Sequence, residues 1–314
     1  MSILLAAVSS TTLPAAAAAA PENISSAATA ILLGWAGLGL LIIYLIGAFR
    51  PASVVGPERL VEDESGFDLL ALICAAIGAH ILGMLSVVRW FHLDQTMTAI
   101  VADIAGKTAG ILAIIIAMSY FRIFNLKKIG LDPWRLGAGI ACGAATLFVI
   151  YPLISITSLI VVSALRTFHL RQPDAHEVLK ILGNRPSRWL KIGTIALAVI
   201  FAPVFEELFF RGLLQTALGR LFSWLGILST ALGSTDAPLP TRVPAPSSTS
   251  RWLAIVVTAA AFAAIHMVPA FFIPLFVLAV GLGYIYERTG NLWITITAHA
   301  MFNGAQILIY LTAK

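Results

Sequence analysis

Long apolar stretches make up most of the chain, and short segments rich in charged, small or proline residues separate them. A helix needs about 20 consecutive apolar residues to cross the hydrocarbon core of a bilayer. The run from 252 to 286 is too long for one crossing, and Pro269 and Pro274 indicate a break between two helices there. The pattern predicts an all-α fold, a polytopic membrane helix bundle of about eight transmembrane helices. The expected spans are 27–49, 69–88, 104–121, 136–165, 192–218, two within 252–286, and 292–311.

Three polar segments divide the chain further. Residues 1–26 contain a run of small residues, as signal peptides do, but they lack the basic residues that signal peptides have at their start. We expect either a signal segment or disorder there. Residues 171–189 alternate charged and apolar positions, which is typical of an amphipathic helix on a membrane surface. Residues 229–250 are rich in Ser, Thr and Pro and are expected to form a flexible loop outside the membrane. These boundaries leave N-terminal transmembrane helices at 27–165 and a C-terminal transmembrane domain at 170–314.

Composition supports the membrane assignment. Hydrophobic residues make up 59% of the chain and charged residues only 11%, whereas soluble domains contain about 25% charged residues. The net charge of +5 is spread over loops without a long basic run, which favours contact with lipid headgroups and gives no indication of nucleic-acid binding. Inside the third span, Lys107 is expected to pair with Asp103 four residues earlier or to extend towards the membrane surface.

The fifth span contains three ionisable residues in the sequence FAPVFEELFFRGLL, namely Glu206, Glu207 and Arg211. Each charge in the middle of a membrane costs about 2.5 to 3.5 kcal/mol, so the cluster needs compensation. Glu207 and Arg211 are four residues apart with the carboxylate first, the favoured order for a helical ion pair. Glu206 is left over beside Pro203, which removes a backbone donor and weakens that turn. We therefore interpret Glu206 as a general base that faces a water-filled cavity.

Other polar side chains occur in two further spans. The sequence FAAIH contains His266, and HAMFN contains His299 and Asn303 one helical turn apart. Each residue by itself is as compatible with packing as with catalysis, but together with Glu206 they indicate one polar site. The chain has neither the HExxH pattern of zinc proteases nor the GxSxG pattern of serine hydrolases. The remaining chemistry is a water activated by glutamate, with or without a metal.

The three ordered patterns EELFFRG, FAAIH and HAMFN resemble the EExxxR, FxxxH and HxxxN motifs of the CPBP family, the CAAX-protease and bacteriocin-processing type of intramembrane protease. The resemblance covers roughly residues 170 to 313 and identifies the C-terminal domain as catalytic. It implies an intramembrane endopeptidase, similar to type II CAAX prenyl endopeptidases, in the plasma membrane of a prokaryote. The expected substrate is a membrane protein or a lipidated peptide, with the bilayer as the other partner. By this resemblance Glu206, His266, His299 and Asn303 are catalytic, and Glu207 and Arg211 support the site.

Two questions stay open at this level. The family has been described both as metalloproteases and as metal-independent glutamate proteases, and His266, His299 and Glu206 are the ligands if zinc is present. Asn303 is a poor zinc ligand, which favours an enzyme without a tightly bound metal. The alternative function is that of a non-catalytic membrane binding protein or a proton-coupled carrier that uses the same buried polar residues.

Overall fold

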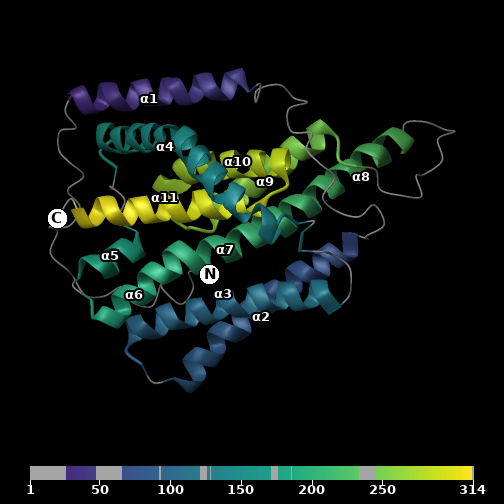
Figure 1. Cartoon of the computed structure of the whole chain (residues 1–314), viewed down its shortest axis with the longest axis horizontal. Coiled ribbons are helices and arrows are strands. Elements are labelled where there is room, and N and C mark those ends of the chain that lie inside the picture. The colour runs from purple at the N-terminus through teal and green to yellow at the C-terminus, as the bar shows by residue number, and fades with distance from the viewer. Residues whose placement is uncertain are drawn as a thin grey trace.

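The computed structural model describes residues 26–46, 66–91, 93–120, 126–127, 129–170, 176–184, 186–232 and 245–312. Within these ranges every regular element is a helix, which confirms the predicted all-α membrane bundle (Figure 1). The elements are α1 (Ser26–Leu45), α2 (Gly66–Trp90), α3 (Gln95–Tyr120), η3 (Pro133–Arg135), α4 (Leu136–Thr167), α5 (Glu177–Gly183), α6 (Arg188–Ala196), η4 (Leu197–Phe201), α7 (Ala202–Glu207), η5 (Leu208–Gln215), α8 (Thr216–Leu232), α9 (Ser248–Ala264), α10 (Pro269–Thr289) and α11 (Leu292–Thr312).

Six helical stretches among the described residues are long and apolar enough to cross a membrane, and the apolar parts of α1 and α9 are shorter. The apolar runs therefore correspond to the observed helices. The division of the run 252–286 is also correct, because α9 ends at Ala264 and α10 begins at Pro269. Pro274 lies inside α10 and does not end it. The predicted pair of Lys107 with Asp103 is present, with 2.5 Å between Nζ and Oδ1.

The polar segments are only partly described. Residues 1–25 of the expected N-terminal segment and 233–244 of the expected loop lie outside the described residues. At both ends of that loop the chain is helical, since α8 extends to Leu232 and α9 begins at Ser248. In the predicted amphipathic segment, α5 packs its apolar side chains against η4 and α11, so that face is covered by protein. This cluster contains Val178, Leu179, Leu182, Ala198, Ile307 and Leu311.

The fifth span is a single helical stretch from 188 to 232 whose type changes along its length. Two π-helical segments, η4 and η5, lie on either side of α7, which is only six residues long. Pro203 predicts a weakened turn in this span, but the sequence does not predict two π-helical segments. Pro203 stands at the start of α7, where its missing N–H removes one hydrogen bond of the helix. Such π segments are rare and occur frequently at functional sites.

This central stretch lies between two groups of helices (Figure 1). The antiparallel pair α2 and α3 contacts it on one side, and α9, α10 and α11 contact it on the other. Helix α4 packs against α10 and α11, and α1 packs on the outside of α4. The segment α7 contacts both α3 and α11, so it is enclosed on two sides by other helices. Four of its six residues are buried, including both glutamates.

Candidate active site

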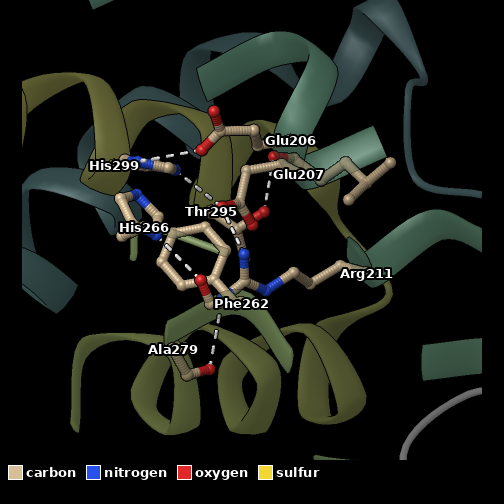
Figure 2. A network of polar contacts seen from close by, with 9 residues as sticks. Glu206, Glu207, Arg211, Phe262, His266, Ala279, Thr295 and His299 are labelled. Carbon is tan, nitrogen blue, oxygen red and sulfur yellow. Dashed lines mark hydrogen bonds and ion pairs between the residues drawn. The ribbon is translucent and has the colours of Figure 1, made fainter. Parts of the chain in front are cut away.

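The Glu207 and Arg211 side chains form a fully buried ion pair at the centre of the site (Figure 2). The distance from Arg211 Nη1 to Glu207 Oε1 is 2.6 Å, as the spacing of four residues predicts. Arg211 Nη2 also donates to the carbonyl of Ala279 on α10, at 3.2 Å. The guanidinium carbon lies 5.0 Å from the centre of the Phe262 ring, within the range of a cation–π contact. The arginine thus connects the central helix to α9 and α10.

Glu207 also binds His299, a contact that the sequence analysis missed. His299 Nδ1 lies 2.8 Å from the same oxygen, Glu207 Oε1. A carboxylate oxygen accepts, so Nδ1 carries the hydrogen and donates it. In the neutral ring Nε2 then has a free lone pair. The Thr295 hydroxyl, one turn earlier on α11, lies beside the same carboxylate (Figure 2). Glu207 therefore fixes both the orientation and the tautomer of His299.

Glu206 faces the opposite nitrogen of that histidine. Its side chain is buried, and Oε2 lies 3.9 Å from His299 Nε2. This distance is too long for a direct hydrogen bond. It is suitable for a bridging water molecule that donates one hydrogen bond to Glu206 and one to His299 Nε2. The two glutamates thus sit on the two sides of one imidazole ring, Glu207 close to Nδ1 and Glu206 further from Nε2.

His266 lies just after the end of α9 and is half-buried. Its Nδ1 is 2.8 Å from the carbonyl oxygen of Phe262, which accepts, so Nδ1 carries the hydrogen and Nε2 has the free lone pair. The Phe262 ring contacts both histidines, with its centre 4.9 Å from the His266 ring and 5.7 Å from the His299 ring. The next residue, Met267, has a φ of 57°, a left-handed turn that ends the helix at this point.

Asn303 makes a hydrogen bond within the bundle that its motif does not predict. Its Nδ2 donates to the carbonyl oxygen of Ala198 at 2.8 Å. Ala198 lies in the π-helical segment η4 and is buried. The amide thus joins α11 to the central helix one turn away from His299. An asparagine amide has two hydrogens, and this contact uses one of them.

His176 is a residue that the sequence analysis did not assign to the site. It precedes α5, and its Nδ1 accepts a hydrogen bond from the Val178 amide at 3.4 Å. Desolvation by the surrounding protein lowers the pKa of His176, and the neighbouring His266 acts in the same direction. Glu206 also acts on it, in the opposite direction. His176 therefore lies close enough to the site to feel its charges. No local sequence signal marks it, because this proximity arises only when α5 packs on the bundle.

The candidate metal ligands can be tested against this geometry. Among the residues that the structure describes, no group of three or more His, Cys, Asp or Glu side chains is arranged to hold a metal ion. His266, His299 and Glu206 are all in the described part of the chain, so these three candidates do not form a common metal position. We therefore derive no chemical step from a metal.

A membrane helix bundle with buried carboxylates and histidines from three helices is typical of a protein with an intramembrane functional site. Residues 188–235 and 239–305 match the family model of type II CAAX prenyl endopeptidase Rce1-like proteins. For this part of the chain, the match bears out the resemblance to the CPBP family of CAAX-type intramembrane proteases. Neither the curated proteins nor the solved structures include a protein that matches the chain. The matched residues contain the two glutamates, Arg211, both histidines of the motifs and Asn303.

Proposed function

We propose that this protein is an intramembrane endopeptidase in which Glu206 activates a water molecule for attack on a peptide bond. The observation that carries the proposal is the arrangement of Glu207, His299 and Glu206 around one imidazole ring. His299 donates from Nδ1 to Glu207 at 2.8 Å, and its Nε2 faces Glu206 at 3.9 Å. A water between them donates one hydrogen to the carboxylate and one to Nε2. Its oxygen lone pairs then point away from both groups, towards a substrate carbonyl.

The reaction follows from these positions. Glu206 takes one proton from the water as the water oxygen bonds to the carbonyl carbon. The tetrahedral intermediate collapses when the C–N bond breaks, and the proton held by Glu206 passes to the leaving nitrogen. Glu207 accepts from Nδ1 and so keeps the Nε2 lone pair of His299 directed at the water while the negative charge develops on the carbonyl oxygen. The free lone pair of His266 Nε2 is a second possible acceptor for the water hydrogen that His299 Nε2 holds, and the second amide hydrogen of Asn303 is available to the oxyanion.

Burial makes the electrostatic part of this mechanism effective. Glu206, Glu207, Arg211 and His299 are all buried in a membrane bundle. In such a low-dielectric site, preorganised charges act more strongly than they would in water. Figure 2 shows the two glutamates and the two histidines gathered around the Phe262 ring. This compact arrangement favours a hydrolytic site over a proton-coupled carrier, whose relay would extend across the membrane.

The family match makes a membrane-associated peptide the expected substrate. Within that class we propose a prenylated CAAX tail first, with a bacteriocin leader or another membrane protein as the alternatives. We place the enzyme in the plasma membrane of a prokaryote.

The experiment is cleavage of a fluorogenic prenylated CAAX peptide by purified protein in vesicles. Glu206→Gln should lower turnover by at least about 10²-fold, because the amide cannot take a proton from water. Asp94→Asn is the matched control: this exposed residue caps α3 through the Met97 amide, and asparagine caps equally well. We expect wild-type turnover for the control. Equal turnover in Glu206→Gln and wild type would contradict the proposal, and so would a folded wild-type protein that cleaves none of the three substrate types.

A further inference from the structure

Phe205 directly precedes Glu206 and packs into the N-terminal helices α2 and α3. Its side chain is buried, and its ring stacks on the His80 ring of α2, with 5.2 Å between centres and 17° between planes. On the α3 side it lies against Gly110, where an added Cβ would be 2.5 Å from Phe205 Cε2. Phe209, one turn later, stacks on Phe205 with 5.9 Å between centres. The Phe205 ring thus fills a slot between His80 and Gly110.

His80 also fits against a glycine of α3, namely Gly106. An added Cβ on Gly106 would be 2.9 Å from His80 Nδ1, so only a glycine allows this close approach. The His80 ring is buried, and neither of its nitrogens has a hydrogen-bond partner within the described residues. The buried Lys107 and its partner Asp103 lie nearby and act on His80 electrostatically. The contribution of His80 to its surroundings is therefore the packing of its aromatic face.

The segment that carries Glu206 needs support from outside. It is an α-helix of only six residues between two π-helical segments, and Pro203 at its start donates no backbone hydrogen bond. A π segment contains one extra residue relative to an α-helix, so a change of its register rotates the following side chains by about 100°. Such a rotation would turn Glu206 away from His299. The backbone hydrogen bonds of this segment therefore do not fix the direction of Glu206.

We infer that His80 and Phe205, seated on Gly110, are positioning residues that hold Glu206 facing His299. We call this contact the α2–α3 clamp, made of His80, Phe205 and Gly110. It assigns a function to helices that lie outside the family match at 188–305. The inference rests on the proposed function, because it concerns the position of the proposed general base. A displacement of about 1 Å at a catalytic group lowers turnover by about 10²-fold.

The test is the turnover and KM of clamp variants in the same vesicle assay, corrected for the folded fraction. Gly110→Ala and His80→Ala should lower kcat by about 10- to 100-fold and change KM by less than about twofold. His80→Phe should restore kcat to within about threefold of wild type, because phenylalanine keeps the stacked face. A purely structural role would change the folded fraction without changing kcat.

Two glycines on the neighbouring helices provide matched controls. Gly39→Ala on α1 produces a similar overlap, 2.6 Å from the carbonyl oxygen of Val149 on α4, without touching α7. Gly78→Ala on α2 meets nothing within 4 Å. Both should keep the wild-type kcat. One outcome would contradict the α2–α3 clamp alone: Glu206→Gln is inactive, but Gly110→Ala and His80→Ala keep the wild-type kcat as Gly39→Ala does. The proposed protease function would then still stand. If wild type is inactive, or Glu206→Gln is as active as wild type, the proposed function itself fails.

Discussion

Replacing Glu207 by glutamine tests the centre of the site most directly. Both the Glu207 side chain and its partner Arg211 are fully buried, and Oε1 accepts from Arg211 at 2.6 Å and from His299 at 2.8 Å. Glutamine has a single acceptor oxygen and no charge. If that oxygen stays with Arg211, the amide hydrogens face His299 Nδ1 and force its hydrogen onto Nε2. The histidine then presents a donor to Glu206 where it previously presented a lone pair.

The expected loss of stability is large. Arg211 would lose its charged partner and would keep neutral contacts, namely the glutamine oxygen, the Ala279 carbonyl at 3.2 Å and the Phe262 ring. Removing one partner of a buried ion pair costs about 3 to 5 kcal/mol. That is a loss of about 10²- to 4 × 10³-fold in the folding equilibrium, from a total stability that is typically about 5 to 15 kcal/mol. The wrong tautomer of His299 should also lower turnover, by about 10²- to 10⁴-fold.

The assay is reversible unfolding in mixed detergent, with Glu207→Gln, Arg211→Met and the double variant compared in a mutant cycle. The double variant should be more stable than the sum of the single effects indicates, by about 2 kcal/mol or more, because it removes both charges together. Additive single effects would refute the reasoning. The same conclusion would follow if Glu207→Gln lost its activity while keeping the wild-type unfolding midpoint.

Three further predictions concern Asn303, His176 and the metal. Asn303→Leu leaves the buried carbonyl of Ala198 without its donor, and unfolding should show a loss of about 1 to 3 kcal/mol; unchanged stability would contradict this role. In the native protein the pKa of His176 is lowered from its ordinary value of 6.5. As the pH falls through 6.5, the unfolded chain therefore binds a proton before the native protein does. The free energy of unfolding should then decrease as the pH falls. Asparagine caps α5 without titrating, so in His176→Asn the unfolding midpoint should fall less steeply with decreasing pH than in wild type. Equal slopes in the variant and in wild type would refute this. Protein treated with a strong chelator should keep its activity and contain well under one zinc per chain in elemental analysis; stoichiometric zinc with chelator-sensitive cleavage would make His266 and His299 ligands.

Several features could be predicted from the sequence because they depend on local properties. Membrane spans follow from the apolar content of about 20 consecutive residues. The ion pairs of Glu207 with Arg211 and of Asp103 with Lys107 follow from the spacing of four residues on a helix. The break before α10 follows from Pro269. The motif residues Glu206, His266, His299 and Asn303 could be named as candidates, although their catalytic roles stay predictions.

Other features depend on contacts between distant parts of the chain. The π-helical segments around α7 could not be foreseen, since the apolar pattern of residues 192–218 suits a uniform α-helix equally well. The motif marks Asn303 as a catalytic candidate, but it does not reveal that the Asn303 amide also donates to a carbonyl of the π segment η4. A helix carbonyl has a second lone pair, and which side chain reaches it depends on how the helices pack.

The sequence by itself determined that this is a membrane helix bundle and which polar residues lie inside it. Hydropathy and short-range spacing act within one helix, so they can be evaluated without knowing its neighbours. Only the tertiary structure decided which residue faces which. Glu207 and His299 are 92 positions apart, and their hydrogen bond exists because α11 packs against α7. The stack of His80 on Phe205 exists because α2 and α3 pack on the opposite side of the same segment. The direction of each side chain around a helix is set by that packing, which no single segment of the sequence contains.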